Sequence, residues 1–181
     1  MQSLFMTTSL YDLSVPTYLQ TVRSIGACLD KAVVHCSDAG IDPDDFVEAR
    51  LVSDMAPFWF QIECVDNYSV WGLNAIKHGS FNPPELVGAI PFNSLRNRIA
   101  ETESTLAAFE PEEVNSWSGK KLDMRIHTDP EDSTFNSETY LLSFLLPNFY
   151  FHAVTAYDIL RIRGVPIGKR DFEGQLRTDP R

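Results

Sequence analysis

The amino-acid sequence predicts an all-α fold, a four-helix bundle with a short β-hairpin before the last helix. In two segments the apolar residues recur at alternating spacings of four and three, which is typical of helices packed in a bundle. A third segment, residues 139–157, has no charged residue, as expected for a helix buried in a bundle or at an interface. The 181 residues are 44% hydrophobic, enough for one core, so we expect a single domain over residues 1–181 with flexible ends at 1–8 and 173–181.

The first helix is expected between Ser14, a capping residue, and Gly40, a left-handed stop, with Pro16 in its first turn. Its inward stripe is Tyr18, Val22, Ile25, Leu29, Ala32 and Cys36. A short helix capped by Asp42 should follow and end near Leu51.

The second long helix is expected to begin at Ser53 or Asp54 and to run toward Gly79. Asp54, Gln61 and Tyr68 recur every seven residues along it, so polar side chains share a stripe that could face inward.

The proline-rich stretch 79–92 predicts a loop, after which Asn93 caps a third helix that ends at Pro111. The stripe of this helix is Leu95, Ile99, Thr102, Leu106 and Phe109. Apolar and polar residues then alternate over 122–127, which predicts one strand of a hairpin whose second strand lies around residues 133–136.

The last helix is expected from Ser137 to about Arg163, with Gly164 ending it. Pro147 should bend this helix and leave carbonyl groups near Ser143 without helical partners. Polar residues inside the uncharged segment argue against a membrane span.

Charge and cysteine content limit the partners. With 15 Lys and Arg against 25 Asp and Glu, the net charge of −10 disfavours nucleic acid and membrane surfaces. The odd number of cysteines (Cys28, Cys36 and Cys64) and the absence of a secretion signal predict reduced, buried thiols and a cytoplasmic location.

The candidate site combines polar residues of the second and last helices, where bundles usually build their sites. His152 is the expected acid–base catalyst, because an imidazole changes charge near neutral pH, and Asp54 is the second catalytic candidate. The expected substrate-binding residues are Gln61, Tyr68, Asn148 and Thr155. The competing interpretations are a helix cap for Asp54 and structural hydrogen bonds between helices for the others.

No metal site and no cofactor are predicted from the residues. Neither position four residues from His152 holds a histidine or carboxylate, and HExxH, CxxC and GxGxxG are absent. The segment 163–172 is expected to be a turn that lays Ile167 and Phe172 on the bundle, with an anion-binding or lid role for Lys169 and Arg170 as the alternative.

The segments 146–152 (LPNFYFH) and 164–172 (GVPIGKRDF), with 9–12 (SLYD) and Asp54-Met55, resemble a bacterial and fungal family of unknown function grouped with DinB/YfiT-like metalloenzymes. The resemblance covers the chain from about Met6 onward and implies a DinB-like four-helix bundle that forms a homodimer. Relatives in that group include thiol-dependent transferases and isomerases that bind a divalent metal through three histidines. Only one of these three histidines, on the last helix, has a counterpart here, and that counterpart is His152.

These observations favour a cofactor-independent enzyme of isomerase, cyclase or lyase type that acts on a small molecule around His152. One alternative is a non-catalytic or stress-associated dimer that binds a metabolite in the same place. Another is a divalent-metal, thiol-dependent transferase like the DinB-like relatives.

Overall fold

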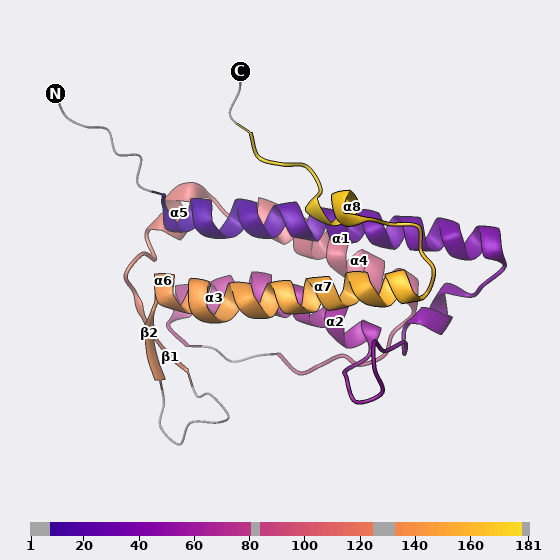
Figure 1. Ribbon diagram of the computed structural model, residues 1–181. Coiled ribbons are helices and arrows are strands. Elements are labelled where there is room, and N and C mark those ends of the chain that lie inside the picture. Colours follow the sequence, from indigo (N-terminus) through magenta and orange to yellow (C-terminus); the bar gives the residue numbers. More distant parts are fainter. Residues whose placement is uncertain (1–7, 81–83, 125–132, 179–181) are drawn as a thin grey trace.

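The computed structural model describes residues 8–80, 84–124 and 133–178 as a bundle of four long helical elements (Figure 1). These elements are α1 (Leu10–Ala39); α2 (Phe58–Asp66), which continues through the π-helical η2 (Asn67–Trp71) into α3 (Gly72–His78); α4 (Phe92–Ala107); and α6 (Ser137–Tyr140), which continues through the π-helical η3 (Leu141–Leu145) into α7 (Leu146–Ile162). The predicted all-α bundle is confirmed.

Shorter elements join the long ones. They are the 3₁₀ helix η1 (Pro43–Phe46), α5 (Pro111–Asn115), α8 (Lys169–Glu173) and the antiparallel strands β1 (Lys121–Met124) and β2 (Ser133–Asn136). The strands pair Leu122 with Phe135, which confirms the hairpin before the last helix. The rest of the predicted alternation, residues 125–127, lies outside the described residues, as do 1–7 and 179–181 of the ends that were expected to be flexible.

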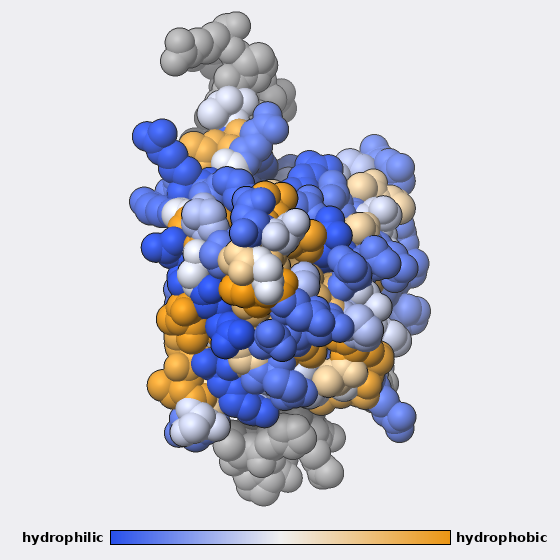
Figure 2. Space-filling view, turned by 90° about the vertical axis from the view of Figure 1, so that its right-hand side faces the viewer, coloured by the Kyte–Doolittle hydropathy of each residue, from blue (hydrophilic) through white to orange (hydrophobic). Residues whose placement is uncertain are grey.

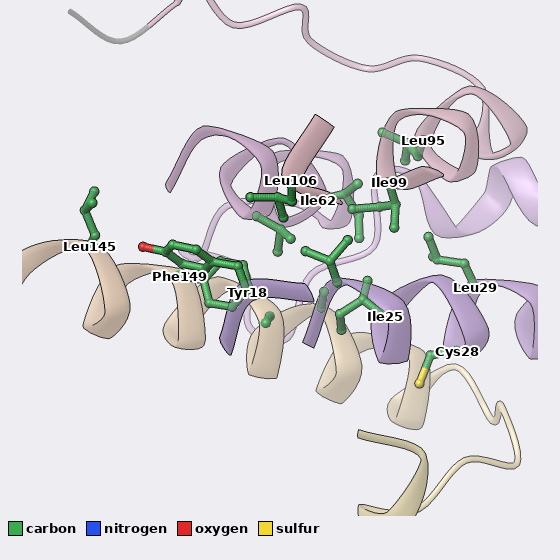
Figure 3. Close-up of a cluster of buried hydrophobic side chains, with 14 of the residues drawn as sticks. Tyr18, Ile25, Cys28, Leu29, Ile62, Leu95, Ile99, Leu106, Leu145 and Phe149 are labelled. Carbon is green, nitrogen blue, oxygen red and sulfur yellow. The ribbon is translucent and has the colours of Figure 1, made fainter. Parts of the chain in front are cut away.

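The core fills the space between α1, α2, α4 and α7, and Figure 3 shows their apolar side chains pointing into one interior. Every residue of the predicted α1 stripe is at most 1% exposed. The ring of Tyr18 packs edge-on against Phe149 of α7, with centroids 4.7 Å apart. The surface at the end of the bundle where α1 and α7 finish is mostly hydrophilic, with apolar groups in smaller patches (Figure 2).

Several predicted helix starts were wrong. Helix α1 begins at Leu10, since Ser9 and Asp12 form a reciprocal capping box, and Ser14 is buried inside the helix. Helix α2 begins at Phe58, with Pro57 at the cap position and no side-chain cap.

Other predicted boundaries also differ from the structure. Helix α4 begins at Phe92, so Asn93 is inside the helix and does not cap it. Asp42 caps as expected, but its 3₁₀ helix ends at Phe46 and does not reach Leu51. Helix α4 ends at Ala107, before Pro111 is reached. Pro111 is instead the first residue of α5, with Glu112 and Glu113 in the favourable first turn.

The two π-helical turns lie against each other. Pro147 lies two residues after η3, and its ring clashes with the carbonyl of residue 143 in a regular α-helix. The widened π turn lies where the bend was predicted. Tyr68 in η2 contacts Phe144 in η3, with ring centroids 5.8 Å apart. At Gly72 the helices approach so closely that a Cβ atom would lie 2.6 Å from Cδ2 of Leu145.

A buried ion pair holds α2 to α4 and to the loop between α3 and α4. Glu63 is 1% exposed and lies 3.2 Å from Nη1 of Arg98. Its Oε1 also accepts a hydrogen bond of 2.7 Å from the backbone N–H of Val87. Because a buried carboxylate is costly without such partners, this contact fixes the loop on the outer side of α2.

Cys28, Cys36 and Cys64 are buried and unpaired, as predicted. Burial raises the pKa of the Cys28 thiol to about 11 and that of Cys64 to about 12, so both are protonated, packed side chains at neutral pH.

Within the described ranges, the helices are too short or too polar to cross a membrane. The exposed side of η3 and α7 carries Leu142, Tyr150, Phe151 and Val154. An apolar stripe of this kind is compatible with the expected homodimer, which stays a prediction.

We predict that Gly72→Ala destabilises the protein. Overpacking against the fully buried Leu145 costs about 1–3 kcal/mol, more than the roughly 0.5–1 kcal/mol gained from the higher helix propensity of alanine.

Gly26→Ala in α1 is the matched control, because its new Cβ would meet Cγ2 of Ile99 at an ordinary 3.6 Å. Urea unfolding should show Gly26→Ala at least as stable as wild type. Equal free energies of unfolding for the two variants would contradict the close packing at Gly72.

Candidate functional site

The candidate site is a buried contact between α2 and α7, which run along one another in the bundle (Figure 1). His152 of α7 is 8% exposed, and its Nδ1 lies 2.7 Å from Oε1 of Gln61 in the first turns of α2. Gln61 is itself 1% exposed. The two residues predicted on facing helices are therefore brought together.

The orientation of the Gln61 amide decides which imidazole nitrogen carries the proton. Nε2 of Gln61 donates a hydrogen bond of 2.9 Å to the backbone carbonyl of Ala56, which can only accept. Oε1 therefore faces His152 and accepts from it, so the proton lies on Nδ1 of the imidazole. Nε2 of His152 is left as a hydrogen-bond acceptor.

Aromatic rings surround the imidazole. Tyr68 stacks on it in parallel, with centroids 5.4 Å apart and an interplanar angle of 6°. Phe60 and Phe151 approach edge-on, with centroids 5.8 and 5.2 Å from that of His152. Tyr68 was predicted as a site residue, and the structure places it in contact with His152.

The enclosure changes the acid–base properties of the cluster. Burial lowers the pKa of His152 to about 4, because the charged imidazolium loses its hydration there. Burial also raises the pKa of Tyr68, with the Cys64 thiol adding to the effect. At neutral pH both side chains are uncharged.

The other predicted site residues do not hydrogen-bond to this cluster. Nδ2 of Asn148 donates to the carbonyl of Phe144, and Oγ1 of Thr155 donates to the carbonyl of Phe151, both at 2.7 Å. Asp54 is exposed in the turn before α2, so its predicted place in the helix was wrong, and it neither caps α2 nor hydrogen-bonds to a described residue.

The sequence interpretation missed two aromatic residues. Phe60 touches His152 directly, and Phe144 contacts Tyr68 edge-on. Phe144 lies eight residues before His152, a spacing that would have placed it on the same helical face. Phe144 lies in the π-helical turn η3, which shifts the helical phase and makes this spacing harder to recognise in the sequence.

The carboxyl-terminal stretch packs as predicted. Ile167 is 3% exposed, and the ring of Phe172 lies 5.6 Å from that of Tyr157. Lys169 is 87% exposed and pairs with Glu173 in the same short helix.

A three-histidine metal site does not fit the residues around His152. Four residues before it, the amide of Asn148 bonds its own helix, and four residues after it, Ala156 is buried in the core. Across the part of the chain that the structure describes, no three His, Cys, Asp or Glu side chains converge to hold a metal ion.

Comparison with known proteins identifies the family. A family model described as a domain of unknown function, DUF1993, matches residues 10–173. The chain belongs to the DUF1993 family. No protein among those with curated descriptions matches it.

A crystal structure of a DinB family member protein from Shewanella denitrificans has the same fold. The two chains are 24% identical and superpose with a TM-score of 0.80, over 95% of this chain and 96% of the other. At this identity the likeness concerns the fold alone, and it confirms the DinB-like bundle expected for this DUF1993 protein.

The lowered pKa of His152 makes stability depend on pH. The unfolded chain binds a proton at a pKa of about 6.5 and the folded chain only at about 4, so unfolding takes up a proton between these values. The stability contribution of about 3 kcal/mol is complete above pH 6.5 and is lost as the pH falls toward 4.

Chemical denaturation of wild type and His152→Gln between pH 4 and 7.5 measures this effect. The difference in their free energies of unfolding should shrink as the pH falls. A constant difference would contradict a neutral, buried imidazole.

Proposed function

We propose that the DUF1993 protein is a small enzyme that uses His152 to move a proton on a small organic substrate, in an isomerisation, cyclisation or elimination. The observation that carries this proposal is the hydrogen bond from Nδ1 of His152 to Gln61. It holds the imidazole in one tautomer, with Nε2 as the basic atom, which is the arrangement that general acid–base catalysis needs.

The reaction class follows from what one imidazole can do. Nε2 takes a proton from one substrate atom and returns it to another, so that atoms and charge balance without a redox partner. The aromatic rings of Tyr68, Phe60 and Phe151 favour a substrate with an apolar or aromatic part.

The low pKa of His152 is compatible with this role when an acidic or anionic substrate is bound. A negative charge beside the ring stabilises the imidazolium and raises the pKa from about 4 toward neutrality. The free protein keeps the imidazole neutral, which is the form that accepts a proton.

A second candidate is a binding protein without catalytic activity. The same low pKa favours it, because a base with a pKa near 4 drives proton abstraction weakly at neutral pH. In that case Nε2 of His152 accepts a hydrogen bond from the ligand and no bond changes.

Incubation with a panel of small aromatic and carbonyl metabolites tests the proposal. Mass spectrometry follows their conversion, and ligand-observed NMR follows their binding. We expect one compound to be converted at least 100-fold more slowly by His152→Gln than by wild type, while the variant still binds it.

His78→Gln is the matched control, because His78 is exposed and outside the cluster. Binding that depends on His152 without conversion would replace the enzyme by the binding protein. Conversion that His152→Gln leaves unchanged would contradict a role for this residue.

A further inference from the structure

A concave site that does not include His152 lies at the surface of α1. It is a cleft of about 510 Å³ between the first half of α1 and residues 175–178. These residues follow α8 in the chain (Figure 1). Its walls include Tyr11, Leu19, Arg23, Leu176 and Arg177. A cleft of this volume is in the range that binds small molecules.

The carboxyl-terminal wall of the cleft is fastened to α1 at both ends. Nε2 of Gln20 donates a hydrogen bond of 2.8 Å to the carbonyl of Glu173. Gly174 then turns the chain with a φ of +62°, and a Cβ there would lie 3.2 Å from that of Ser24. Arg177 reaches back to the carbonyl of Asp12 and to Oγ1 of Thr17, at 3.3 and 3.2 Å.

The two arginines have unused hydrogen-bond donors. A guanidinium has five N–H groups. Arg23 uses its Nε–H on Glu103 at 2.7 Å, and Arg177 uses one donor on each of its two contacts. Toward the described residues, four N–H groups of Arg23 and three of Arg177 have no partner.

Two carboxylates lie beside these arginines. Glu103 forms an ion pair with Arg23 at 2.7 Å. Asp12 accepts hydrogen bonds from the backbone N–H and the hydroxyl of Ser9 in the helix cap, which lower its pKa, and the charge of Arg177 adds to the effect. Both arginines line this cleft, in a chain with a net charge of −10. Guanidinium pairs carboxylates in a bidentate geometry, and apolar side chains stand beside these two.

We propose that this cleft binds a small organic carboxylate with an apolar body. The carboxylate group pairs with Arg23 and Arg177, and the apolar body lies against Tyr11, Leu19 and Leu176. The site does not depend on the function proposed for His152, because its residues do not include the His152 cluster and Arg23 is exposed on α1, whereas Tyr18 and Val22 are buried in the core.

Titration of the ¹⁵N-labelled full chain with benzoate, and separately with neutral benzamide, tests this proposal. At low ionic strength we expect benzoate to shift the amide resonances of Gln20, Arg23 and Arg177, and benzamide to bind at least tenfold more weakly. Arg177→Gln and Arg23→Gln should each weaken benzoate binding at least tenfold.

Lys169→Gln is the control, since it removes the same charge from an 87% exposed side chain and should leave benzoate binding unchanged. Inorganic phosphate is the third probe, and equal binding of phosphate and benzoate would overturn the role of the apolar wall. Absence of shifts at the cleft, or equal benzoate binding by wild type and Arg177→Gln, would overturn the proposal.

Discussion

The hydrogen bond between His152 and Gln61 is the constraint on which the arrangement of α2 and α7 depends. An imidazole can be buried at low cost only when it is neutral and its N–H has an acceptor. Gln61 provides that acceptor, and its own amide needs the carbonyl of Ala56 to hold it in the right orientation. The carbonyl of Ala56, the amide of Gln61 and the imidazole of His152 thereby link the turn before α2 to the register between the two helices.

The two π-helical turns also determine how α2 and α7 face each other. A π turn contains one residue more than an α turn, so it changes the face that the following residues present. In η2 it accompanies the stacking of Tyr68 on His152, and just beyond it Gly72 allows η3 to approach within contact of the backbone. Such turns are frequent at functional sites, which agrees with the location of the candidate site beside them.

Much of the fold could be predicted because it follows from repeating patterns. The buried stripes of α1 and α4 follow from apolar residues that recur every three or four positions. The hairpin follows from the alternation of apolar and polar residues. The start of α1 could not be placed, because Ser9 and Ser14 are equally good caps in sequence and only the position of Asp12 relative to Ser9 decides between them. The predicted start of the last helix at Ser137 agrees with α6. The π turns have no comparable pattern.

Part of the candidate site could also be predicted from the sequence. Gln61, Tyr68 and His152 were identified from helical spacing, and they do meet. Asn148 and Thr155 share a face with His152, but their side chains bond carbonyls of their own helix, a competition that helical spacing does not reveal. The sequence also contains no signal for how strongly burial lowers the pKa of His152.

The tautomer of His152 is the most direct test of this account. Long-range ¹H–¹⁵N NMR of the imidazole at pH 7 should show a neutral ring protonated at Nδ1, and Gln61→Leu should release that preference. A ring protonated at Nε2, or one charged at pH 7, would contradict the hydrogen bond to Gln61 and with it the role proposed for His152.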